Sequence, residues 1–132
     1  LSDNFSSSIV VDPPVDFDTI LREELEYQGV PSIVASALRF FWFTKTGESI
    51  DDITPEKALA NGNSQELFIV SNLLDERVKP HHRDKLVSIA QNLGIPHSIE
   101  YYENYGHVEN VWGSIDEWEN TILNYFDRTL SG

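Results

Sequence analysis

Two residues that could do acid–base chemistry, Asp75 and His107, each follow a segment with the pattern of a β-strand. The first segment includes Leu67 to Val70, a run of apolar residues without polar alternation, which is typical of a strand covered on both faces in a parallel sheet. The carboxyl ends of parallel strands meet at one edge, where open α/β sheets bind ligands, so we expect the two side chains to meet there. A carboxylate that orients an imidazole, and an imidazole that acts as a base, are two members of a hydrolytic triad. The nucleophile is missing from this chain.

The elements expected around these residues alternate between strands and helices. We expect strands over residues 9–11, 67–70 and 97–102, and helices over residues 16–29, 31–43, 54–61, 81–92 and 114–126. Such alternation predicts an α/β fold with a parallel sheet and helices on its faces. About three strands are few for a sheet of this kind, so we expect the second half of a larger sheet.

The helix expected after Pro31 is apolar around most of its circumference between Ile33 and Phe43. Such a helix should be buried or should face an apolar ligand. We favour burial in the core over a share in a substrate pocket.

Composition and charge narrow the classes of function. The chain has 132 residues, with 22 acidic against 9 basic side chains and a formal charge of −13, which disfavours nucleic acid and anionic membranes as partners. Without cysteine there is no disulfide framework or thiolate zinc site. The longest apolar block is too short for a membrane span, so we expect a soluble protein, with the cytoplasm slightly favoured. Because the sequence begins with Leu1 and lacks methionine, we expect a processed, cleaved or partly determined product.

The other titratable residues give weaker indications of a functional site. His81, His82 and Asp84 could suggest a metal site, but adjacent side chains on a helix point about 100° apart, which is poor geometry for one ion. We therefore expect no metal at these residues. We also expect no cofactor. His97 is expected to be structural. Glu109, two residues beyond His107, is interpreted as an exposed acid, with modulation of the histidine as the alternative.

Two sequence segments resemble the α/β-hydrolases. Residues 67–80 resemble the acid-bearing strand and turn of that family, in which a glycine turn precedes Asp-x-x-Val-x-Pro. Tyr105-Gly106-His107-Val108-Glu109 resembles the loop of its catalytic histidine. Residues 9–14 are similar to the strand after the nucleophile helix, and residues 15–62 then correspond to a helical cap. Asn72 stands where the family usually has glycine; asparagine tolerates a positive φ, so the turn can survive.

The resemblance covers nearly the whole chain beyond Ser8, but only the carboxyl-terminal half of the family fold. It implies a serine hydrolase of esterase or peptidase type, with His107 as base and Asp75 as its orienting acid. Phe41 and Trp42, on the cap, and Val108 would contact a small ester or peptide substrate that carries an acyl or aromatic group.

The Gly-x-Ser-x-Gly nucleophile elbow has no counterpart here; the nearest string, residues 62–66, lacks the second glycine. The chain alone is therefore not expected to be active, and the missing amino-terminal half is its expected partner. The alternative function is a non-catalytic binding or partner module that keeps the half-fold and pairs through an exposed sheet edge. A stand-alone flavodoxin-like domain is disfavoured, because no phosphate-binding glycine loop is visible.

Overall fold

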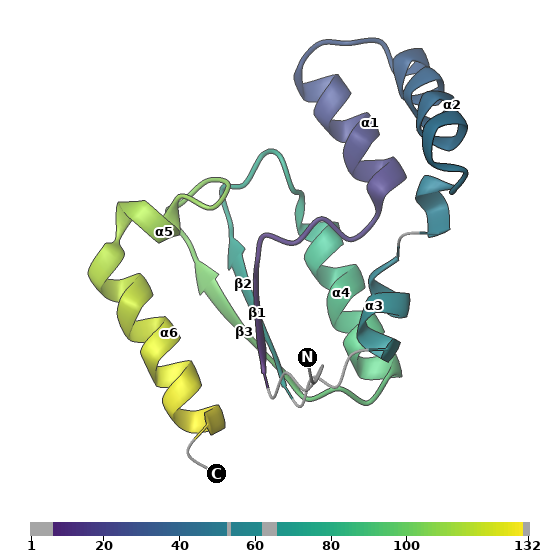
Figure 1. The fold of residues 1–132 in the computed structure, drawn as a ribbon. Helices are drawn as coiled ribbons and strands as arrows, with labels where there is room; N and C mark the ends of the chain where they lie inside the picture. The colour runs from purple at the N-terminus through teal and green to yellow at the C-terminus, as the bar shows by residue number, and fades with distance from the viewer. Residues whose placement is uncertain (1–6, 53, 62–65, 131–132) are drawn as a thin grey trace.

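The structure, a computed structural model, describes residues 7–52, 54–61 and 66–130 of the chain. The residues of the elbow-like string that precede Glu66 lie outside these ranges, as do residues 53 and 62 of the predicted cap. The described chain has an α/β fold with one three-stranded parallel sheet in the order β1-β2-β3 (Figure 1). The strands are β1 (Ser8–Val11), β2 (Leu67–Asn72) and β3 (His97–Tyr102). The helices are α1 (Phe17–Tyr27), α2 (Ile33–Thr46), the short 3₁₀ helix η1 (Ile50–Asp52), α3 (Pro55–Asn61), α4 (Pro80–Asn92), α5 (Asn110–Gly113) and α6 (Ile115–Leu130).

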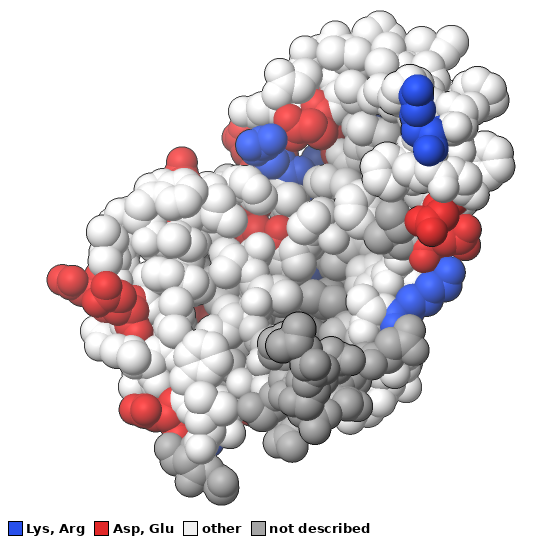
Figure 2. Space-filling model, in the orientation of Figure 1, with Lys and Arg blue, Asp and Glu red and all other residues white. Residues whose placement is uncertain are grey.

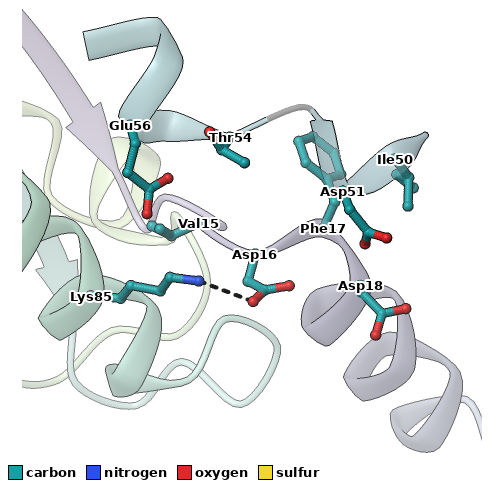
Figure 3. A pocket seen from close by; sticks show the side chains of 9 residues that line it. All are labelled: Val15, Asp16, Phe17, Asp18, Ile50, Asp51, Thr54, Glu56 and Lys85. Carbon is teal, nitrogen blue, oxygen red and sulfur yellow. Dashed lines mark hydrogen bonds and ion pairs between the residues drawn. The ribbon is translucent and has the colours of Figure 1, made fainter. Parts of the chain in front are cut away.

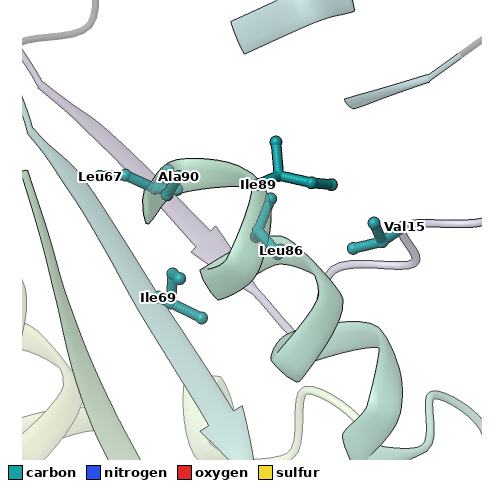
Figure 4. Packing of buried hydrophobic residues seen from close by; sticks show 6 residues of the cluster. All are labelled: Val15, Leu67, Ile69, Leu86, Ile89 and Ala90. Atoms are coloured by element: carbon teal, nitrogen blue, oxygen red, sulfur yellow. The ribbon is translucent and has the colours of Figure 1, made fainter. Parts of the chain in front are cut away.

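The central strand β2 has all six of its residues buried, which confirms the prediction of a strand covered on both faces. On one face, Leu67 and Ile69 pack against Leu86, Ile89 and Ala90 of α4 (Figure 4). On the other face, a second cluster joins β2 and β3 to α6 through the side chains of Phe68, Val70, Tyr102 and Tyr125. The fold therefore has three layers (Figure 1). α4, together with α3, lies on one face of the sheet, and α6 lies on the other.

Parallel pairing brings the three strand ends to one edge of the sheet. Val11 pairs with Val70, and Asn72 pairs with Tyr102, so the chain leaves each strand at nearly the same level. The segments that follow are the linker to α1, the loop that carries Asp75 and the loop that carries His107. This edge is where the sequence predicts the candidate site to lie.

A pair of antiparallel helices, α1 and α2, stands beyond this edge (Figure 1). The α1 helix begins as predicted after Asp16, whose side chain accepts the backbone N–H of Thr19 at 3.0 Å. The α2 helix ends at Gly47, which has a φ of 74° and so takes the left-handed conformation that glycine adopts without steric cost. α3 packs against α4 rather than with this pair.

The core interpretation of α2 is wrong for the described chain. Phe40 is 70% exposed, Phe41 59% and Ile33 77%, and the one buried residue of the helix is Ala35. Within the described residues, the main contacts of the helix are with α1 and η1, and most of its large apolar side chains are exposed. Figure 2 shows that much of the visible face of this lobe carries neither acidic nor basic side chains. Within the described residues, no helix combines the length and the apolar character that crossing a membrane requires.

Candidate functional site

The candidate site is a hydrogen-bonded pair formed by Asp75 and His107. The Nδ1 atom of His107 lies 2.8 Å from Oδ2 of Asp75, whose side chain is 1% exposed, whereas that of His107 is 29% exposed. An ionised carboxylate can only accept, so Nδ1 carries the proton and, in the neutral imidazole, Nε2 keeps its lone pair. The pair therefore presents a ring nitrogen that can accept a proton at a partly open surface.

The loop after β2 holds the carboxylate of Asp75 in place through its second oxygen. Oδ1 accepts the backbone N–H groups of Arg77 at 2.8 Å and Val78 at 2.9 Å. An aspartate that bonds the amides two and three residues ahead of it is a common way to stabilise a tight turn. Both oxygens are thus engaged, one by the turn and one by His107, so the carboxylate has little freedom to rotate.

The loop after β3 is bonded to the acid loop and to itself. The N–H of Leu74 donates to the carbonyl of Tyr105 at 3.1 Å, which ties the two loops together. The carboxylate of Glu109 accepts the N–H of Gly106 at 2.9 Å, so this acid closes the histidine loop. Val108 has a φ of 48°, a strained value for a β-branched residue.

A second buried carboxylate, that of Asp12, lies beside this pair and was not identified from the sequence. It follows β1 directly and is 4% exposed. Ligand atoms of Asp12, Asp75 and His107 all lie within 4.8 Å of one another. A metal there would have to displace the Asp75–His107 hydrogen bond and the amides that Asp12 binds. The rule that predicted Asp75, an acid just beyond a buried strand, would also have selected Asp12.

Asn72 differs from the expectation of a positive-φ turn. The non-glycine residues with positive φ in the described chain are Asp12 and Val108, and Asn72 is instead the last residue of β2. Its Nδ2 donates to Asp12 at 2.6 Å and to Oδ1 of Asn110 at 2.7 Å. The asparagine therefore serves the site through its side chain, in a position where glycine could make no such bonds.

Two cavities open beside His107. One, of about 460 Å³, is lined mainly by apolar residues of α1 and the segment before it, with His107 and Val108 at one end. Its α1 residues are Phe17, Ile20, Leu21 and Glu24. The other, of about 410 Å³, is bordered by Tyr27, Leu74, Trp112 and the histidine loop. His107 and Arg77 line both, so the imidazole stands between an apolar cavity and a second opening.

The predicted substrate residues occupy different places. Val108 lines both cavities beside His107, whereas Phe41 and Trp42 lie on α2 with exposed side chains. The apolar surface that faces the pair thus comes from α1. A role for Phe41 and Trp42 in substrate contact stays a prediction.

An ion pair links the helical pair to the acid loop. The guanidinium of Arg77 donates to both carboxylate oxygens of Glu24, from Nε at 3.2 Å and from Nη2 at 3.0 Å. Hydrogen bonds from Gln28 and then from Arg77 lower the pKa of Glu24, and the carboxylate of Glu24 raises the pKa of Arg77. This bidentate contact lies between the two cavities and joins α1 to the turn that holds Asp75.

A further cavity, of about 250 Å³, lies where α1, η1, α3 and α4 meet (Figure 3). Its polar lining includes Asp16, Asp51, Glu56 and Lys85, and Lys85 donates to Asp16 at 3.0 Å. The N–H of Thr19 and the ammonium of Lys85 lower the pKa of Asp16 to about 2. Asp16 is therefore ionised as a helix cap and a salt-bridge partner, and the cavity does not include His107.

A second cluster of possible metal ligands, Glu23, His81 and His82, lies between α1 and α4. The expectation that the two histidines point apart is wrong: their ring centroids are 4.4 Å apart, and both Nε2 atoms approach Glu23, at 3.4 Å and 3.0 Å. Nδ1 of the fully buried His82 accepts the N–H of Val15 at 3.2 Å. Its Nε2 therefore carries the proton and donates to Glu23, so this nitrogen has no lone pair for a cation.

The comparisons with known proteins are consistent with this geometry at the level of the fold. No family model matches the sequence, and no curated protein matches it. An esterase from Pyrococcus furiosus has a similar structure, with a TM-score of 0.63 and 16% sequence identity, and the match covers 92% of this chain and 44% of the esterase. The chain thus spans less than half the length of that protein, and its α/β fold, predicted from the sequence, matches part of the fold of an esterase.

Proposed function

We propose that this chain is the acid- and histidine-bearing part of a serine hydrolase that cleaves ester or amide bonds. The observation that carries the proposal is the hydrogen bond between Nδ1 of His107 and the buried carboxylate of Asp75, beside an apolar cavity. This is the geometry that a general base and its orienting acid require. The similar fold of an esterase supports the same reaction class.

In the proposed reaction, Nε2 of His107 takes the proton of a serine hydroxyl as its oxygen bonds to the carbonyl carbon of the substrate. The imidazolium then returns the proton to the leaving group as the bond between carbonyl carbon and leaving group breaks. Water repeats the sequence and releases the acid. Asp75 stabilises the imidazolium and keeps the proton of the neutral ring on Nδ1.

The serine is proposed to come from the amino-terminal half of the fold, in the same gene product or in a second chain. β1 has β2 as its single neighbour among the described strands, so its other edge is the place where a further parallel strand could pair. Residues 15–62 are proposed to act as a cap, with the apolar side of α1 facing the acyl or aromatic part of the substrate. The cavity of about 460 Å³ lined by α1 is large enough for a group of that kind.

The test uses the complete protein that contains this chain. We expect a fluorophosphonate probe to label one serine, and His107→Ala to abolish labelling and the hydrolysis of p-nitrophenyl esters. His97→Ala is the matched control, because His97 lies at the opposite end of β3 and bonds the carbonyl of Ile95. Hydrolysis that persists in His107→Ala would contradict the proposal.

The second candidate is a non-catalytic binding module. It is favoured by the exposed apolar residues of α2 and by the position of β1 at one end of the described strand order. Under this alternative, the complete protein would form a stable complex through that edge, and the fluorophosphonate probe would label no serine. Labelling that depends on His107 would exclude it.

A further inference from the structure

We propose that Asp12, at the carboxyl end of β1, is a positioning residue that holds His107 against Asp75. The inference adds a third residue, and a second carboxylate, to the site formed by Asp75 and His107. It rests on the proposed function only for its effect on hydrolysis, because the positioning itself is a property of the folded chain.

The carboxylate of Asp12 joins three segments that are distant in sequence. Oδ2 accepts the N–H of Val108, the residue after His107, at 2.8 Å. Oδ1 accepts the backbone N–H of Asn72 at 2.8 Å, and Oδ2 also accepts Nδ2 of that residue at 2.6 Å. One side chain therefore connects the end of β1 to the end of β2 and to the histidine loop.

Unlike a carboxylate in a surface ion pair, the carboxylate of Asp12 is buried and is bonded by uncharged donors. Asp12 is 4% exposed, and burying a carboxylate is costly unless hydrogen bonds satisfy it. The partners that the described chain offers to it are amide groups of Asn72 and Val108, which are uncharged. Hydrogen bonds of amides to an ionised acceptor are shorter and stronger than neutral ones, so the charge increases the strength of the contact to the histidine loop.

Backbone strain is concentrated at the two ends of this contact. Asp12 has a φ of 41° and Val108 a φ of 48°, and these are the non-glycine residues with positive φ in the described chain. Strained residues persist where their surroundings over-determine them, and they cluster at active sites. The bond from Val108 to Asp12 supplies that constraint, and it sets the course of the chain directly after His107.

The hydrogen bond between His107 and Asp75 should therefore depend on the hydrogen bond between Val108 and Asp12. Without the carboxylate, Val108 can relax to a negative φ, and the imidazole loses its place beside Asp75. The bond between Nδ1 of His107 and Oδ2 of Asp75 should then lengthen or break, while the sheet, which rests on the two apolar clusters, remains.

The test follows the low-field proton resonance of the Nδ1–H group of His107 by NMR, in the complete protein. Asp12→Asn keeps the size of the side chain and tolerates positive φ, but it removes the charge and places an amide donor against other donors. We expect this resonance to disappear. A second variant replaces the amide of Val108 with an ester, which deletes one N–H donor and leaves Asp12 and Asn72 intact; it should have the same effect.

Asp16→Asn is the matched control, because it removes one carboxylate from the same linker without touching the histidine loop. It should retain the resonance. If the Val108 ester variant keeps the resonance unchanged, the inference is overturned, even if Asp12→Asn has failed to fold. A resonance that is lost equally in Asp16→Asn would overturn it as well.

The kinetics of ester hydrolysis give a second, separate test of the role of Asp12. A displacement of the base by about 1 Å lowers turnover by roughly a hundredfold, so Asp12→Asn should lower kcat to that extent with a smaller change in KM. If the unaltered protein shows the resonance and responds to both variants but hydrolyses no ester and binds no fluorophosphonate, the proposed function fails and the positioning role of Asp12 stands. If the unaltered protein hydrolyses esters and the variants leave both resonance and kcat unchanged, the positioning role fails alone.

Discussion

The backbone N–H of Val15 donates to Nδ1 of His82 at 3.2 Å, and Nε2 of the same ring lies 3.0 Å from Glu23 of α1. The imidazole is fully buried, and each of its nitrogens has a partner within the protein. Val15 belongs to the linker between β1 and α1, and His82 belongs to α4. One side chain of α4 therefore attaches both the linker and α1 to the helix layer that covers one face of the sheet.

His82→Ala should lower the free energy of unfolding by about 3 kcal/mol, because it leaves a buried N–H without an acceptor and creates a cavity. Urea denaturation would measure the change. His81→Ala is the matched control: its side chain is 53% exposed, and its effect should stay within about 0.5 kcal/mol. Equal losses in the two variants would contradict this account of α4.

If the proposed function is correct, Asp75→Asn should lower kcat for ester hydrolysis in the complete protein by roughly ten-thousand-fold. The amide group of asparagine can donate to Nδ1 of His107, which would place the ring proton on Nε2 and remove the base. Steady-state kinetics would measure the loss. Asp84→Asn, which changes an exposed acid paired with Arg83, should leave kcat unchanged, and an equal loss there would point to a general effect of charge.

Asp16→Ala should cost about 1 kcal/mol of stability near neutral pH, because the variant loses the cap of α1. The folded chain lowers the pKa of Asp16 from 3.8 to about 2, mainly through the N–H of Thr19. Because the pKa is lower in the folded chain, ionised Asp16 stabilises the folded state at pH values above the unfolded pKa of 3.8. This contribution is lost as the pH falls through the folded pKa of about 2. The difference between variant and parent in urea denaturation should therefore shrink between about pH 4 and pH 2; a constant difference would contradict the assignment.

Leu21→Trp should narrow the apolar cavity beside His107 and, under the proposed function, shorten the acyl chain that an ester substrate can carry. The ratio of kcat/KM for a long p-nitrophenyl ester to that for the acetate should fall by about tenfold or more, since each misplaced methylene costs about 1–3 kcal/mol. Ile33→Trp, at an exposed position of α2, is the control. A ratio that falls equally in both variants would argue against α1 as the wall of the proposed acyl site.

Local patterns were sufficient for the three strands, the five longer helices and part of the site, but not for the short helices η1 and α5. The unbroken apolar run of β2 predicted a strand buried on both faces, and Asp16 predicted the start of α1. The positions of Asp75 and His107 after parallel strands predicted that they would meet, and their side chains lie 2.8 Å apart. Each of these inferences uses residues that are neighbours in sequence, together with a general rule for parallel sheets.

The exposure of α2 could not be predicted in the same way. Its apolar residues run from Ile33 to Phe43 around the helix, and this periodicity shows which surfaces avoid water without showing what covers them. In the described chain, α1 and η1 cover one side. The buried contacts of a helix depend on the layers around it, and those layers are formed by distant parts of the polypeptide.

The sequence by itself determined the α/β order of elements, the buried central strand and the acid and histidine that follow two of the strands. The tertiary structure alone decided that Asp12 holds Val108, that Asn72 bonds Asp12 through its side chain, and that His82 receives the N–H of Val15. These contacts join residues 96, 60 and 67 positions apart. The physical reason is that a hydrogen bond requires its donor and acceptor within about 3 Å, and only the folded chain sets that distance for residues so far apart in sequence.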